Sequence, residues 1–143
     1  MGRYINAEDR ALILDAIAKY GWGYDEGEFE MLGDAFTEDA VTGGVVTGTA
    51  LGWGPLTGRS QIVDALAKIR GGQTDQRRHT IHTCRFEDQT PTTAKLCTYV
   101  VVLASKNGET RVATAGRYSI DAVKEADGVW RMSRLEAVLD SAF

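Results

Sequence analysis

The chain has 143 residues, of which 43% are hydrophobic and 25% charged, a composition that indicates one globular domain and excludes intrinsic disorder. Its formal net charge of −4 argues against nucleic acid as a main partner, because phosphate binding needs a basic surface. Two cysteines are too few for a secreted disulfide scaffold, and neither a signal peptide nor a stretch of membrane-spanning length is visible, so we expect a cytoplasmic protein.

The N-terminal part of the chain is expected to be helical. Asn6 is a suitable N-cap, apolar residues then recur every three or four positions, and Gly27 is a suitable C-cap. This pattern predicts a first helix between these two residues. A second, short helix should follow, with Phe29, Leu32 and Phe36 on one face.

The middle of the chain changes from a strand pattern to a third helix. Residues 39–58 are rich in glycine and threonine, which predicts two short strands joined by an exposed loop. Ser60 is then expected to cap a helix that ends at the glycine pair 71–72. The pair Arg77-Arg78 that follows is interpreted as a solvated turn.

The second half predicts an antiparallel sheet. Asn107-Gly108 is a strong hairpin signal, and Asp127-Gly128 predicts another tight turn. Helices followed by a meander of strands indicate an α+β domain with helices on one face of a curved sheet. Because both faces of residues 96–103 are apolar, the outer one should be buried in a homo-oligomer. The expected strands are 79–87, 93–105, 110–124 and 129–139.

Asp25 and the two histidines are the candidates for proton-transfer chemistry. Asp25 extends the apolar stripe of the first helix, where a carboxylate is costly unless it is paired, functional, or able to reach water at the helix end. Strand alternation places His79 and His82 on opposite faces, which makes them a poor metal pair, and a lone strand histidine is more often structural than catalytic. Aromatic residues that could line a pocket or simply fill the core are Tyr20, Trp22, Tyr24 and Trp53.

Six short motifs, in the same order along the chain, resemble those of SnoaL-like proteins. They are YDEGEFEML at 24–32, AFTEDAV at 35–41, GRSQI at 58–62, Arg78-His79, GRY at 116–118 and DGVWR at 127–131. The resemblance covers nearly all of residues 1–143 and implies a single domain with the cone-shaped fold of nuclear transport factor 2 (NTF2-like). This fold is α+β, with a curved, mostly antiparallel sheet and three helices on its concave face around a pocket.

The resemblance also implies a catalytic site. Scytalone dehydratase and hexachlorocyclohexane dehydrochlorinase pair an aspartate at the end of the first helix with a strand histidine, and the matching positions here are Asp25 and His79, with Tyr24 as an assisting hydroxyl. Such a pair is a general base that needs neither a cofactor nor a metal. It implies a dehydratase-type lyase acting on a small apolar, aromatic or polycyclic metabolite. The expected substrate-binding residues are Tyr20, Trp53, Arg117, Ser119 and Asp121, the last on a strand where SnoaL-type cyclases place a catalytic aspartate.

The sequence differs from scytalone dehydratase at two positions, and two other functions remain compatible with the motifs. Gly43 or Gly44 stands where scytalone dehydratase has a second tyrosine, and Val102 or Leu103 where it has a second histidine, so scytalone itself is not the expected substrate. The same base could serve an isomerase or an aldol cyclase. The protein could instead be a non-catalytic ligand-binding or assembly subunit, as in ring-hydroxylating dioxygenases. We expect a homodimer or homotrimer formed through the sheet, and no membrane partner.

Overall fold

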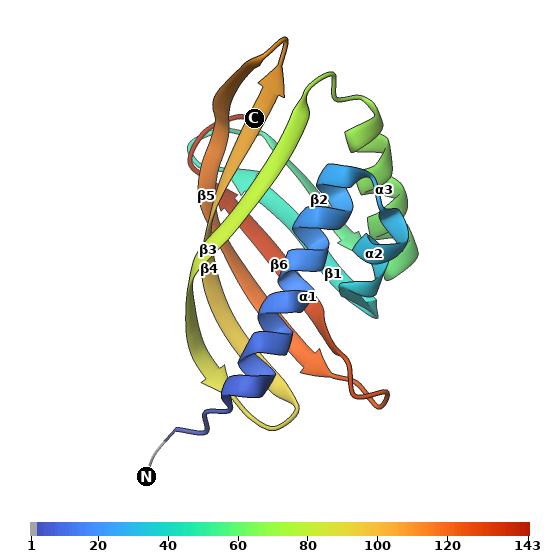
Figure 1. Ribbon diagram of the computed structural model, residues 1–143, viewed down its shortest axis with the longest axis vertical. Helices are drawn as coiled ribbons and strands as arrows, with labels where there is room; N and C mark the ends of the chain where they lie inside the picture. The colour runs from blue at the N-terminus through green and yellow to red at the C-terminus, as the bar shows by residue number, and fades with distance from the viewer. Residues whose placement is uncertain (1–2) are drawn as a thin grey trace.

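The computed structural model describes residues 3–143, which form three helices and one six-stranded sheet (Figure 1). The strand order is β2-β1-β6-β5-β4-β3, and neighbours are antiparallel except for the parallel pair β1 and β6. The predicted curved, mostly antiparallel sheet is therefore confirmed. The elements are α1 (Ala7–Glu26), α2 (Phe29–Asp34), β1 (Phe36–Val46), β2 (Gly52–Thr57), α3 (Arg59–Gly71), β3 (Gln76–Gln89), β4 (Thr93–Lys106), β5 (Glu109–Lys124) and β6 (Trp130–Leu139).

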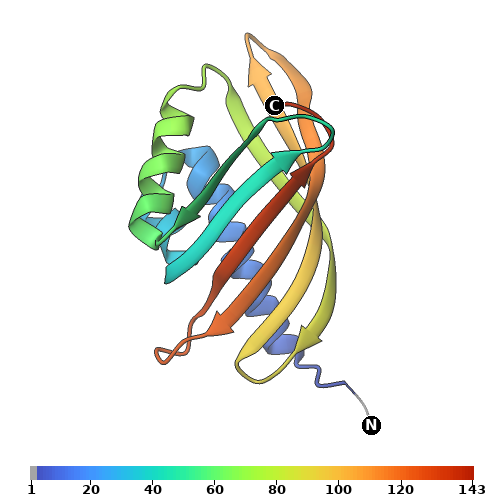
Figure 2. The same cartoon turned by 180° about the vertical axis from the view of Figure 1, so that it is seen from behind.

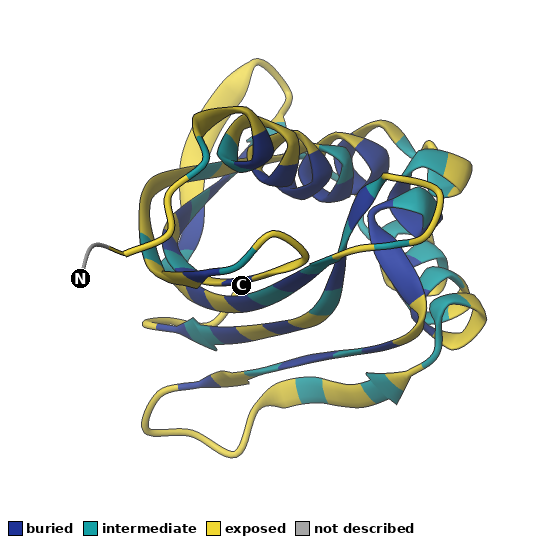
Figure 3. Cartoon of the chain, turned by 90° about the horizontal axis from the view of Figure 1, so that it is seen from below, coloured by how far each residue is buried: buried dark blue, intermediate teal, exposed yellow. Residues whose placement is uncertain are grey.

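The sheet has an inner face toward the helices and an outer face that no helix covers within the described residues (Figures 1 and 2). Strand alternation assigns side chains to these faces. Leu96 and Val100 of β4 are buried on the inner face, whereas Tyr99, the residue before Val100, is 57% exposed on the outer face. The residues buried on the inside of α1 and of the sheet face one another (Figure 3).

Helix α1 begins and ends where the sequence predicts. The Asn6 side chain accepts a hydrogen bond from the Asp9 N–H at 2.9 Å, and Gly27 adopts the left-handed conformation with φ of 70°. Gly23 allows the close approach of α2, because a Cβ at this position would lie 2.7 Å from the Leu32 nitrogen. These contacts fix the last turn of α1, which contains Asp25.

Three local details differ from the sequence prediction. Helix α3 begins at Arg59 with Gly58 as N-cap, not Ser60, because the chain turns at Gly58 with φ of 93°. Phe36 is fully buried as the first residue of β1 and does not belong to α2. The turn at Asp127-Gly128 is part of a longer connection from 125 to 129, whereas Asn107-Gly108 forms the predicted hairpin, with both φ angles positive.

One end of the space between helices and sheet is closed by packing. Trp130 of β6 donates its indole N–H to Asp9 of α1 at 3.1 Å, and both side chains are buried. Met132 and Leu135 fill the adjacent core and are fully buried. Among residues 3–143, no helix is both long enough and apolar enough to cross a bilayer.

Candidate active site

The structure brings Asp25 of α1 and His79 of β3 into direct contact. Asp25 is 6% exposed, and its Oδ1 lies 2.6 Å from Nδ1 of His79. Its other oxygen, Oδ2, accepts the backbone N–H of His79 at 2.7 Å. Gly21, one helical turn earlier, faces the His79 backbone, and its lack of a side chain keeps α1 close to β3. The carboxylate is therefore held by both oxygens in one orientation.

The backbone of Asp25 is held as firmly as its side chain. Its carbonyl oxygen accepts hydrogen bonds from the Arg70 guanidinium at 3.0 Å and from the Gln76 side-chain amide at 2.9 Å. A carbonyl in the last turn of a helix has no partner within the helix, so these donors from α3 and β3 satisfy it. Three elements thus converge on Asp25, the residue that orients His79.

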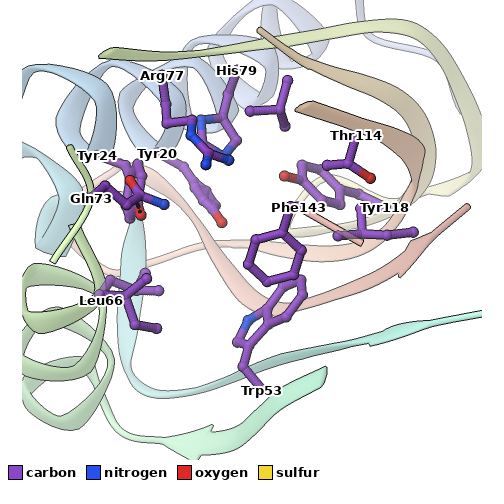
Figure 4. A pocket seen from close by; sticks show the side chains of 13 residues that line it. Tyr20, Tyr24, Trp53, Leu66, Gln73, Arg77, His79, Thr114, Tyr118 and Phe143 are labelled. Atoms are coloured by element: carbon purple, nitrogen blue, oxygen red, sulfur yellow. Dashed lines mark hydrogen bonds between the residues drawn. The ribbon is translucent and has the colours of Figure 1, made fainter. Parts of the chain in front are cut away.

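His79 also lines a cavity between the helices and the inner face of the sheet (Figure 4). The cavity offers about 70 Å³ in which the centre of a water-sized molecule fits, and it opens to solvent. Among residues 3–143, the one buried side-chain nitrogen or oxygen without a partner is Oγ1 of Thr98, so Nε2 of His79 is not sealed in the core. The lining residues are Tyr20, Tyr24, Trp53, Leu66, Ile69, Gln73, Arg77, His79, Val102, Thr114, Tyr118, Leu139 and Phe143.

The contact with Asp25 selects one tautomer of the neutral His79 imidazole. A carboxylate accepts the proton on Nδ1, which leaves the lone pair of the neutral ring on Nε2. A group placed at Nε2 within the cavity therefore meets a proton acceptor. When the ring takes up a proton, the positive charge that develops is stabilised by the adjacent carboxylate.

Three tyrosines surround this proton acceptor. The Tyr24 ring meets the His79 ring edge-on, with centroids 5.1 Å apart, and its hydroxyl donates to Gln73 at 2.9 Å. Burial raises the pKa of Tyr24 to about 12. Tyr20 and Tyr118 stack with centroids 6.0 Å apart, and burial raises the pKa of both hydroxyls well above the ordinary value. All three hydroxyls therefore keep their protons at neutral pH and can act as hydrogen-bond donors.

The SnoaL-like domain family matches residues 6–136, which is most of the chain. The chain belongs to the SnoaL-like family. No curated protein matches it. The family membership agrees with the motifs in the sequence and with the arrangement of helices around the concave face of the sheet.

Solved structures similar to this SnoaL-like protein share its fold. An NTF2-like protein with a cystatin-like fold from Novosphingobium aromaticivorans is 27% identical, with 92% of this chain and 82% of that chain covered and a TM-score of 0.72. A Catenulispora acidiphila protein in complex with S-DNPA is 24% identical, with coverage of 94% and 95% and a TM-score of 0.78. The β subunit of a putative aromatic-ring-hydroxylating dioxygenase from Novosphingobium aromaticivorans is 20% identical, with coverage of 93% and 90% and a TM-score of 0.75.

Three of the expected substrate-binding residues do not face the cavity of the SnoaL-like protein. Tyr118 and Ile120 of β5 are buried on the inner face, so alternation turns Arg117, Ser119 and Asp121 to the outer face. The structure therefore does not bring these three side chains to the cavity that contains His79. The resemblance placed them correctly on β5, but the positions are shifted by one residue from those whose side chains face the cavity.

The remaining candidates divide between the cavity and the outside. Tyr20, Tyr24 and Trp53 line the cavity with His79, whereas Trp22 of α1 is 64% exposed. His82 lies on the outer face beside Tyr99, opposite to His79 as strand alternation predicts. Among residues 3–143, no three His, Cys, Asp or Glu side chains gather closely enough to hold a metal ion.

Sequence reasoning missed several residues of the cavity. Arg77 was interpreted as part of a solvated turn, yet it precedes His79 by two positions on β3, and strand alternation alone would have placed both on one face. Tyr118 could have been found in the same way from β5. Gln73 and Phe143 lie outside helices and strands, where no periodic signal indicates a direction.

Proposed function

We propose that this SnoaL-like protein is a cofactor-independent lyase that eliminates water from a small, largely apolar β-hydroxyketone. The observation that supports this proposal is the buried Asp25–His79 pair at the wall of a mainly apolar cavity. A buried carboxylate is costly to maintain, and here both of its oxygens serve one histidine. This arrangement suits a general base, which needs a fixed ring and a partner for the charge that it acquires.

In the proposed reaction, Nε2 of His79 removes a proton from the carbon next to the substrate carbonyl. The electron pair of the broken C–H bond moves toward the carbonyl oxygen, where Tyr20 or Tyr118 donates a hydrogen bond. The C–O bond at the β carbon then breaks as the C=C bond forms. The leaving hydroxide takes the proton back from the imidazolium, directly or through Tyr24, and the products are an α,β-unsaturated ketone and water.

The cavity lining favours an aromatic or polycyclic substrate. Trp53 and Phe143 meet edge-on with ring centroids 5.5 Å apart, and Leu66, Ile69 and Leu139 add aliphatic surface. An apolar wall gains free energy from covering apolar substrate surface, and a dry site strengthens the hydrogen bonds to the developing enolate. The complex of the Catenulispora acidiphila protein with S-DNPA supports a small-molecule ligand for this fold.

An isomerase or an aldol cyclase would use the same base, because both also begin with removal of a proton next to a carbonyl. A non-catalytic assembly subunit is the alternative suggested by the likeness to a dioxygenase β subunit. The fully engaged Asp25 favours an enzyme over a subunit of that kind, because a scaffold gains nothing from a buried carboxylate held against an accessible imidazole.

One experiment in heavy water distinguishes these functions. Tetralone, a bicyclic ketone, reports removal of the proton next to its carbonyl as deuterium uptake by NMR, and its β-hydroxy derivative reports elimination as formation of naphthol. The lyase proposal predicts both reactions. Uptake of deuterium without elimination would point to an isomerase or cyclase, and the absence of both with the wild-type protein would overturn the proposal.

The two histidines provide matched variants for this experiment. We expect His79→Ala to lower both rates by about 10²–10⁴-fold, the usual cost of losing a positioned general base. His82→Ala removes the same side chain from the outer face and should leave both rates unchanged. Melting temperatures of both variants show whether the loss is chemical, because His79→Ala should still fold.

We also propose that the protein forms a homodimer or homotrimer through the outer face of the sheet. Tyr99 is 57% exposed there, on β4, the strand next to the β3 edge of the sheet, and half-buried apolar side chains lie near it. Burial of such a patch against a second copy removes apolar surface from water.

A further inference from the structure

Positive charge gathers around the turn where α3 leads into β3, beside the cavity, although the whole chain is acidic. Arg77 lines the cavity, and the exposed Arg111 has its guanidinium 3.7 Å from the Asp75 carboxylate. Lys106 donates to Thr74 at 3.1 Å, which places a third cation beside the same turn. Asp75 contacts both arginines with a single negative charge, so it cannot neutralise the whole group.

Arg77 is held so that part of its guanidinium remains available. Nε donates to one oxygen of Asp75 at 2.6 Å and one Nη donates to the other at 3.3 Å, which fixes the plane of the group. The side chain is 11% exposed. The second Nη has no hydrogen-bond partner among residues 3–143, yet it is not sealed in the core. Because Arg77 lines the cavity beside His79 (Figure 4), a substrate in the cavity would come near this unpaired Nη.

We propose that Arg77 determines substrate specificity by binding a carboxylate group on the otherwise apolar substrate. This inference rests on the proposed function, because it assigns the substrate class for the cavity that contains the Asp25–His79 pair. Arginine matches the planar geometry of a carboxylate, and Asp75 orients the guanidinium before the substrate arrives. The substrate would then be an aromatic or polycyclic keto acid.

The position of Arg77 also sets where the carboxylate lies relative to the reacting carbon. Arg77 and His79 are two residues apart on one strand, so their backbones are separated by roughly 7 Å. A carboxylate bound at Arg77 would hold the rings against Trp53 and Phe143, with the acidic C–H directed to Nε2 of His79. Binding energy from a group remote from the reaction would thus orient the reacting bond.

The inference is tested by binding, independently of turnover. Naphthoic acid and naphthamide have nearly the same shape but differ in charge, so their dissociation constants, measured by titration calorimetry, isolate the contribution of the carboxylate. We expect the wild-type protein to bind the acid at least about tenfold more tightly than the amide, as for a charge-assisted hydrogen bond. Equal affinity of the wild-type protein for both probes would overturn the inference without the need for any variant.

Neighbouring arginines supply the matched variants. Arg77→Gln should remove the preference for the acid, whereas Arg78→Gln should keep it, because Arg78 points outward and pairs with Glu26. If Arg77→Gln lowers the melting temperature too far to be measured, Arg77→Lys keeps the charge and should retain part of the preference. Persistence of the full preference in Arg77→Gln, or its loss in Arg78→Gln, would contradict the proposal.

His79→Ala separates this inference from the proposed function. The variant lacks the base but keeps Arg77, so it should be inactive on tetralone and still prefer naphthoic acid to its amide. An inactive variant that keeps the preference supports both proposals. Loss of the preference in His79→Ala would show that the carboxylate is bound by the imidazole, which overturns the role of Arg77 while leaving the base in place.

Discussion

At the scale of single residues, Asp25 has the most constrained environment of the site. Its two oxygens accept hydrogen bonds from the ring and the backbone of the same histidine, and its own carbonyl is bound by Arg70 and Gln76. A residue with every polar atom engaged has no freedom to leave its partner. The His79 ring therefore needs no reorganisation when it takes up a proton, which is the property that a general base requires.

Asp25→Asn tests this constraint. The amide retains the shape but has one acceptor oxygen, so an NH₂ group faces either the His79 backbone N–H or the Nδ1 proton. We expect proton abstraction to slow by at least about 10²-fold, and the free energy of unfolding to fall by about 1–3 kcal/mol for a buried donor without an acceptor. Tetralone exchange and urea unfolding measure the two effects. Asp15→Asn, an exposed site on α1, is the control, and full activity of Asp25→Asn would argue against the dyad.

At the scale of elements, Arg131 of β6 connects α2 with the β5–β6 turn. Its guanidinium is 12% exposed and donates to Asp34 at 2.8 Å, to Glu125 at 3.0 Å and to Asp127 at 2.9 Å. The hydrogen bond from Arg131 lowers the pKa of Asp34. One arginine thus fixes the end of α2, which packs against the last turn of α1 that contains Asp25.

Arg131→Met should therefore destabilise the fold in a pH-dependent way. We expect the free energy of unfolding to fall by about 1–2 kcal/mol at neutral pH. This is less than for a fully buried network, because the carboxylates that Arg131 contacts are partly exposed. A lowered pKa stabilises the folded state above the unfolded value of about 3.9, and this contribution disappears as the pH falls through the folded pKa. Urea unfolding should show that the difference in free energy of unfolding between the wild type and Arg131→Met becomes smaller below about pH 4. Arg134→Met, on the exposed outer face, should leave the free energy of unfolding nearly unchanged. A stability difference between wild type and Arg131→Met that does not depend on pH would contradict an ionic origin of the effect.

At the scale of the whole molecule, the fold followed from the sequence more completely than the site did. Capping by Asn6 and Gly27 and the hairpin turn at Asn107-Gly108 are local signals, and the structure agrees with them. The family resemblance placed Asp25 and His79, whose meeting depends on two elements distant in sequence. It failed for Arg117, because a slip of one residue along a strand moves every side chain to the other face. Phe143 could not be anticipated, since its place depends on how the finished sheet curves.

The outer face of the sheet is the largest feature that a single chain leaves unexplained. Strand pairing sets Val45, Val138, Arg117, Tyr99 and His82 side by side across five strands. Val45 is 55% and Tyr99 57% exposed in the isolated chain. Arg117 carries the one full charge in this row, so contact with a second copy would bury apolar surface and desolvate one arginine.

A negative charge introduced into this row at Tyr99 should prevent self-association. We expect the wild-type protein to scatter light as a dimer or trimer at micromolar concentration and Tyr99→Glu to scatter as a monomer, because a carboxylate without a partner is costly to bury at an interface. Leu12→Glu, on the solvent side of α1 where Leu12 is 46% exposed, is the matched control and should stay oligomeric. Because Tyr99 points away from the cavity, Tyr99→Glu should still bind naphthoic acid. A monomeric wild-type protein would show that the outer face of the sheet remains in contact with water.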